Sequence, residues 1–193
     1  MKKFKLVSFA ALLFAGTVLP GNKIFAQDGT VEHNYLQGKT GEWSVVMTLR
    51  PSADAPAQII SGLAAERIMI GDYCLHEIMH PAASVKMPGF KRLCDFAYNL
   101  NEQRWDYMSI DTRITAGIMY FTYQGTDSNT ITSFITSFPN PGMGPGQKGR
   151  GQSLYCRNVV IKIDNDHDMV RQYWRLTDKT EWLAVQYDYT RSH

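Results

Sequence analysis

The sequence predicts an all-β protein, an antiparallel up-and-down meander of about ten strands that closes into a barrel. After residue 40, strand-like segments alternate with turn residues, and almost no segment has the 3.6-residue period of an amphipathic helix. The connections are mostly of hairpin length, too short for the crossover helix that parallel pairing requires. A sandwich is the alternative, but closure removes exposed strand edges, so the barrel is favoured.

The expected strands follow one another from residue 42 to residue 191. Each is rich in aromatic, β-branched or alternating apolar residues and is bounded by turn-forming residues. They are residues 42–50, 57–70, 73–80, 89–99, 104–111, 117–124, 129–138, 152–164, 168–177 and 181–191. Residues 34–38 are expected to form a helical turn that plugs one barrel end. The Pro/Gly-rich residues 139–151 are expected to form a loop, either a lid over a barrel mouth or an insertion without a role.

The N-terminus has the pattern of a secretory signal peptide. Lys2, Lys3 and Lys5 precede an uncharged apolar run at residues 6–19, which is shorter than the roughly 20 residues of a spanning helix. Cleavage is expected after Ala26, where a small residue precedes a polar stretch. Since no cysteine lies near this position to carry a lipid, we expect a periplasmic or secreted protein.

Three segments follow from this prediction: a signal peptide at residues 1–26, a polar lead-in at 27–40 and one barrel domain at 41–193. The signal carries four lysines and no acidic residue, so its removal changes the formal net charge from +2 to −2. A near-neutral domain lacks the basic surface that nucleic acids or anionic membranes require. We therefore expect no nucleic-acid partner and no stable membrane insertion of the mature protein, while its oligomeric state stays open.

The three cysteines allow two interpretations. If the hairpin of residues 73–80 and 89–99 is centred near Ser84, Cys74 lies opposite Cys94, and an exported protein could join them as a disulfide. Alternatively, all three thiols are buried and pack as small apolar groups. A metal site at Cys74, His76 and His80 is disfavoured, because the outer two lie about 20 Å apart along an extended strand. We expect no metal and no cofactor.

Aromatic residues make up 12% of the chain and suggest a ligand cavity. Along residues 104–111, aromatic and polar side chains alternate onto one strand face. A barrel can use such a face to hold a small hydrophobic or amphipathic molecule, or the tryptophans can simply fill its core. The candidate ligand-binding residues are Trp43, His76, Arg92, Trp105, Tyr107, Ser109 and Asp111.

Three classes of function remain open. No nucleophile motif such as Gly-x-Ser-x-Gly or Ser-x-x-Lys occurs in the sequence, so a binding protein is favoured over an enzyme. An isomerase or hydrolase with a site inside the barrel is the first alternative, using inward His76, Asp111 or arginine side chains. An envelope interaction or structural module that uses a barrel end and residues 139–151 is the second.

Several segments, taken in order, resemble domain of unknown function family 1579. They are Gly41-Glu42-Trp43, ERIMIGDY at 66–73, SID at 109–111 with TAGIM at 115–119, and EWLAVQYDYTR at 181–191. The resemblance implies a calycin-like or lipocalin-like barrel of exported bacterial proteins, with no catalytic motif to transfer. The sequence departs from the family pattern at Ala97, where a glycine is usual, and in the enlarged loop at residues 139–151.

Overall fold

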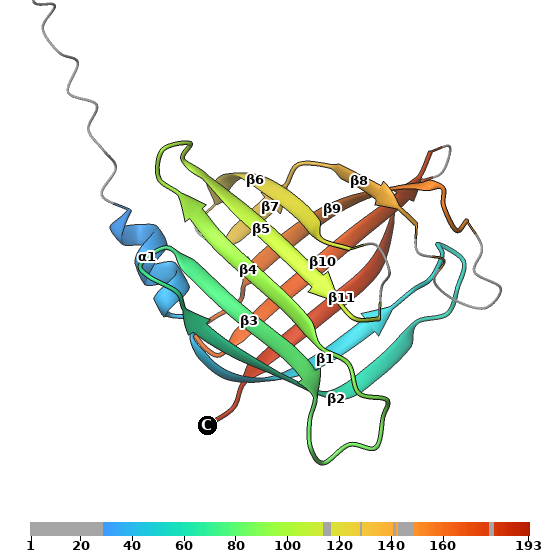
Figure 1. Cartoon of the computed structure of the whole chain (residues 1–193), viewed down its shortest axis with the longest axis horizontal. Helices are drawn as coiled ribbons and strands as arrows, with labels where there is room; N and C mark the ends of the chain where they lie inside the picture. Colours follow the sequence, from blue (N-terminus) through green and yellow to red (C-terminus); the bar gives the residue numbers. More distant parts are fainter. Residues whose placement is uncertain (1–28, 114–116, 128, 141, 143–148, 178–179) are drawn as a thin grey trace, which may run out of the picture.

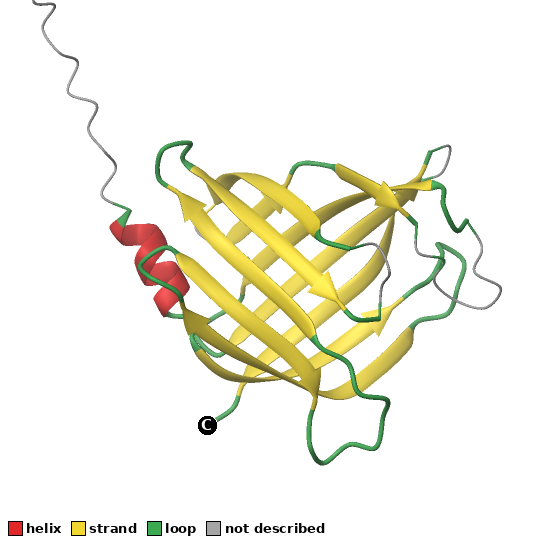
Figure 2. Cartoon of the chain, viewed as in Figure 1, coloured by secondary structure: helices red, strands yellow, loops and turns green. Residues whose placement is uncertain are grey.

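The computed structural model describes residues 29–113, 117–127, 129–140, 142, 149–177 and 180–193 of the chain. The signal peptide expected at residues 1–26 lies outside the described residues. The expected all-β architecture is confirmed: ten antiparallel strands form a closed barrel, with one further strand paired at its side (Figure 1). Figure 2 shows the strands wrapping around the molecule and the helix at one end.

The described elements follow the predicted order closely. They are α1 Thr30–Gln37, β1 Gly41–Leu49, β2 Gln58–Met69, β3 Cys74–Pro81, β4 Arg92–Asn99, β5 Arg104–Asp111, β6 Met119–Asp127, β7 Thr130–Ser133, β8 Thr136–Pro139, β9 Ser153–Lys162, β10 His167–Leu176 and β11 Trp182–Arg191.

Closure of the barrel depends on β9, which pairs with three other strands. It joins β10 along its whole length, β7 near its C-terminal end and β8 near its N-terminal end. The single strand expected at residues 129–138 is therefore divided between β7 and β8. Phe134 and Ile135 lie at the break with about half of their surface exposed, and the Phe134 amide bonds back to β6. Two short strands thus fill one position in the barrel wall.

The β3–β4 hairpin has a different register from the one expected. Cys74 lies opposite Ala97 and Cys94 lies opposite Glu77, so the hairpin is centred between Val85 and Lys86 rather than near Ser84. Changing the pairing by an odd number of residues moves a side chain to the other face of a sheet. Cys94 is buried inside the barrel, whereas Cys74 is on the outer face, and all three cysteines are free. The Cys74–Cys94 disulfide prediction is wrong in this structure.

Helix α1 covers one end of the barrel and is longer than the expected turn at residues 34–38 (Figure 1). Leu36 is completely buried, and the Tyr35 ring lies 5.4 Å from the ring of Trp105. Directly after the helix, the Lys39 carbonyl accepts a 3.0 Å hydrogen bond from the Trp43 indole. The described part of the lead-in, residues 29–40, therefore packs against the barrel. None of the described helical segments is long and apolar enough to cross a bilayer.

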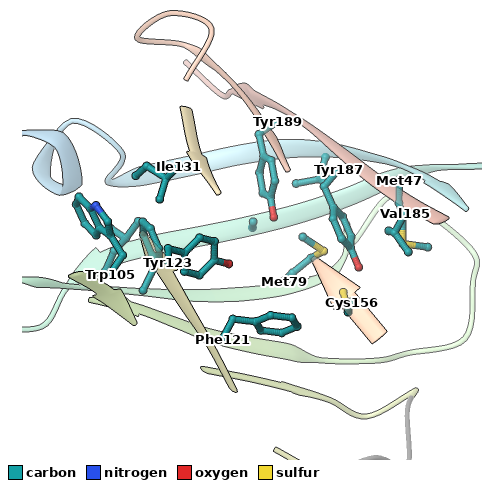
Figure 3. Close-up of a cluster of buried hydrophobic side chains, with 14 of the residues drawn as sticks. Met47, Met79, Trp105, Phe121, Tyr123, Ile131, Cys156, Val185, Tyr187 and Tyr189 are labelled. Atoms are coloured by element: carbon teal, nitrogen blue, oxygen red, sulfur yellow. The ribbon is translucent and has the colours of Figure 1, made fainter. Parts of the chain in front are cut away.

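The barrel interior is rich in aromatic side chains. Phe96 and Trp105 stack in parallel with their ring centroids 4.8 Å apart, and Tyr123 packs edge-on against Phe96. Figure 3 shows Tyr187 and Tyr189 extending from β11 into the same space. The alternation of strand side chains places these rings inside, where they exclude water and stabilise the fold.

Candidate functional site

Charged side chains lie inside this apolar barrel, at inward positions of the strands. Arg67 on β2, Glu77 on β3 and Asp168 on β10 are almost fully buried, as is Lys39 in the link between α1 and β1. Strand alternation places Glu77 between the inward-facing Leu75 and Met79. Full burial of such residues is rare unless they are paired, so each of these charges requires a partner.

Four of the interior charges pair with one another. The Asp168 carboxylate accepts from Lys39 Nζ at 2.5 Å and from Arg67 Nη1 at 2.8 Å. Arg67 Nε also donates to Glu77 Oε2 at 2.8 Å, and the Tyr189 hydroxyl donates to Glu77 Oε1 at 3.2 Å. Two cations and two carboxylates thus form a chain that is balanced in formal charge. Burial lowers the pKa of Lys39 to about 8, although Asp168 partly opposes this.

Arg92 adds a fifth charge, which the four paired groups do not balance. Among the described residues its ion-pair partner is Glu77, whose Oε1 lies 3.7 Å from Arg92 Nη1 and already accepts from Tyr189. Arg92 Nη2 donates to the Tyr107 hydroxyl at 2.5 Å, and the guanidinium lies over the Tyr187 ring at 4.5 Å. Only 4% of Arg92 is exposed. Among the described residues that line the larger cavity beside Arg92, cations therefore outnumber carboxylates by one.

Two further polar groups near Arg92, the Cys94 thiol and the Tyr107 hydroxyl, remain neutral near pH 7. Cys94 Sγ lies 3.0 Å from the Tyr107 hydroxyl, and both side chains are inside the barrel. Burial raises the pKa of the Cys94 thiol, and burial likewise raises the pKa of Tyr107 well above its ordinary value. Neither group therefore supplies the negative charge that Arg92 lacks.

Two small cavities adjoin Arg92 and Tyr107. The larger has a volume of about 50 Å³, and its charged lining residues are Lys39, Arg67, Glu77, Arg92 and Asp168. Its apolar wall is formed by Leu75, Phe96, Tyr123, Val160 and Val170. The smaller, of about 20 Å³, is lined by Ser109 and Asp111 together with Arg92 and Tyr107. The larger cavity has room for about three to five water-sized groups.

Asp111 has its own partner on the side of the smaller cavity. Its carboxylate accepts from Arg113 Nε at 2.9 Å and from Arg113 Nη2 at 2.6 Å. The Arg113 guanidinium also covers the ring of Phe90 at 3.8 Å. This pair is neutral as a whole and leaves the excess charge at Arg92.

The structure brings most of the sequence-predicted site residues into the barrel. Arg92 and Tyr107 line both cavities, and Ser109 and Asp111 line the smaller one. Trp43 and Trp105 also point inward, but they pack in the core and line neither cavity. His76 is on the opposite face of β3, where its Nδ1 lies 2.6 Å from Asp95 Oδ1.

Sequence reasoning missed the paired charges of the site, namely Lys39, Arg67, Glu77 and Asp168. The available signal was the position of Arg67 and Glu77 at alternate sites with apolar neighbours in predicted strands. In the described part of the chain, no three His, Cys, Asp or Glu side chains come together in a way that could hold a metal ion.

The fold and its interior define a class of protein: a closed β-barrel with a small, charged and partly apolar internal cavity. The family model described as protein of unknown function (DUF1579) matches residues 28–191, so the chain belongs to this family. The resemblance inferred from the sequence segments is thereby confirmed. A comparison with curated proteins finds no match.

Proposed function

We propose that this protein binds a small amphipathic acid inside its barrel, with the acid group at Arg92. The observation that supports the proposal is the buried guanidinium of Arg92, which adjoins a cavity and whose ion-pair partner among the described residues, Glu77, is shared with Arg67. A buried charge without a dedicated counter-ion is costly, and a bound carboxylate would offset that cost. Arginine also suits carboxylates geometrically, because its planar N–H groups can donate in parallel to both oxygens.

The composition of the larger cavity favours an amphipathic ligand over a purely polar one. Besides its charged groups, the cavity is lined by the rings of Phe96 and Tyr123 and by the methyl groups of Val160 and Val170, which provide apolar surface. Sites of this kind bind through apolar area and fix orientation through a few polar groups. An acid with a hydrocarbon tail satisfies both sides of the cavity.

The test is an NMR titration of the ¹⁵N-labelled protein with butyrate, butanol and butylamine. We expect saturable shifts at residues around Arg92 with butyrate, and much weaker responses to the alcohol and the amine. Arg92→Met should abolish the butyrate response. Arg104→Met is the matched control, because it removes one arginine from an exposed position on β5 that lines neither cavity.

Two results would reject the proposal. Equal responses to butyrate and butanol would mean that the cavity does not select for an acid group. Butyrate binding that survives Arg92→Met but is lost in Arg104→Met would move the site to the protein surface.

We also propose that the mature protein begins at Gln27 and acts in the periplasm or outside the cell. The support is the charge and hydropathy pattern of residues 1–26, which is typical of a cleaved signal. N-terminal sequencing of the protein from periplasmic extracts tests this, with Gln27 as the expected first residue. Recovery of the intact Met1 terminus from the cytoplasm would contradict export.

A further inference from the structure

We infer that the acid held at Arg92 is a short monocarboxylic acid of about two to five carbons, and that longer acids are excluded. This inference rests on the proposed function and adds the size and charge of the ligand. It follows from the volume of the cavities, from the groups that close them and from the single excess charge.

The volume sets an upper limit on the tail. The cavity of about 50 Å³ accommodates about three to five water-sized groups, which corresponds to a carboxylate with a few carbons. The second cavity adds about 20 Å³, and Arg92 and Tyr107, joined by a 2.5 Å hydrogen bond, line both spaces. A tail that extends from the larger space into the smaller one has to pass these two side chains.

The walls of the larger cavity offer little room for expansion. Its helix-side boundary includes the Lys39–Asp168 ion pair, and the fully buried Leu36 of α1 packs in the same core. The adjacent wall includes Phe96, which is fixed by its stack on Trp105. A longer tail has to separate a buried ion pair or displace stacked rings, and both changes are unfavourable.

The charge of the site favours an acid with one carboxylate. The larger cavity is lined by three cations and two carboxylates, Glu77 and Asp168. One bound carboxylate balances this set. A second one would lie near Glu77 and Asp168 without a cation of its own, which raises the energy of the bound state.

The experiment is a titration of the wild-type protein at pH 7 with acetate, propionate, butyrate, pentanoate, hexanoate and octanoate, and with the diacid succinate. We expect affinity to rise about fourfold for each added methylene that finds apolar surface. The maximum should fall between propionate and pentanoate, and octanoate should bind about tenfold more weakly than the best acid. Succinate should bind more weakly than butyrate.

A cavity variant tests the same limit from the protein side. Val160→Ala removes two methyl-sized groups from the apolar wall, and we expect the best-binding acid to become longer by at least one carbon. Val46→Ala is the control, because it makes the same substitution on the partly exposed outer side of β1 and should leave the preference unchanged.

The outcomes separate this inference from the proposed function. Affinity that continues to rise through octanoate, or succinate binding as tight as butyrate, would overturn the short monocarboxylic acid and leave an acid-binding barrel. An unchanged length preference in Val160→Ala would also overturn the size limit. Failure of every acid to bind would overturn the proposed function itself.

Discussion

Replacement of Arg92 and of Arg67 by methionine should have very different effects on stability, although both arginines are buried inside the barrel. Arg67 donates at 2.8 Å to two carboxylates, those of Glu77 and Asp168. Its removal leaves both acids short of a partner. Breaking a buried ion pair in this way costs about 3–5 kcal/mol, and we expect Arg67→Met to lower the free energy of unfolding by that amount.

Removal of Arg92 leaves no carboxylate without a partner, because Glu77 keeps Arg67 and Tyr189. The variant loses a charged hydrogen bond to Tyr107, worth about 1.5–3 kcal/mol, and a cation–π contact with Tyr187 of about 2 kcal/mol. These losses are offset because the variant no longer bears the desolvation cost of the buried guanidinium, which is on the order of several kcal/mol. We expect Arg92→Met to change the free energy of unfolding by less than about 1.5 kcal/mol in either direction.

Urea unfolding, followed by tryptophan fluorescence, measures the free energy of unfolding of both variants without ligand. Their midpoints can be compared when this free energy depends on urea concentration with the same slope in each variant. Saturating butyrate should raise the midpoint of the wild type and leave that of Arg92→Met unchanged. If Arg92→Met destabilises the protein as much as Arg67→Met does, Arg92 is a structural residue and not a residue held in place for a ligand.

Three further predictions concern the barrel itself. The pKa of Lys39 is about 8 in the folded protein against an ordinary 10.5, so the unfolded chain binds more protons between these values, and stability should rise by about 1.6 kcal/mol from pH 8 to about pH 9.5. Urea midpoints should change less with pH across this range in Lys39→Met, and an equal pH dependence in both proteins would contradict the shift. Ellman's reagent should find at most the partly exposed Cys74 in the native protein and all three thiols after unfolding without reductant, whereas fewer than three would indicate a disulfide. Trp105→Ala removes the stack on Phe96 and should lower the free energy of unfolding by about 3–5 kcal/mol. The control Tyr120→Ala, on the exposed surface, should lower it by less than about 0.5 kcal/mol. Similar losses in both variants would contradict the placement of Trp105 in the core.

The fold was predictable because it depends on local patterns. Alternating apolar residues and hairpin-length turns define strands and their order, and sequential antiparallel strands leave few topologies. The division of residues 129–138 into β7 and β8 was not predictable in this way. The division depends on which parts of β9 pair with β7 and with β8, and on the hydrogen bond from the Phe134 amide to β6.

The β3–β4 register depends on contacts within the connecting loop. The Val85 amide bonds to the Ala82 carbonyl, and the Ala82 amide bonds to Gly62 on β2. These contacts set the centre of the hairpin, and an odd displacement of that centre reverses the faces of the two cysteines. No pattern within the hairpin specifies them.

The candidate site was predictable where one strand carried the information. Tyr107, Ser109 and Asp111 alternate along β5, and period two alone places them on one face. The orientation of β3 was not predictable, because burial of a glutamate is unfavourable without partners, and the partners of Glu77 lie on other strands. Glu77 is stabilised by Arg67 and Tyr189 from other strands, and His76 consequently faces outward.

In the proposed complex, Arg92 holds the carboxylate of a short acid while the tail packs on the apolar residues of the larger cavity. Intermolecular NOEs between the methyl group of bound butyrate and the labelled protein would locate the tail. We expect NOEs to the ring of Phe96 and to the methyl groups of Val160 and Val170, all of which line that cavity. NOEs confined to exposed side chains such as Tyr120 or Phe134 would contradict it.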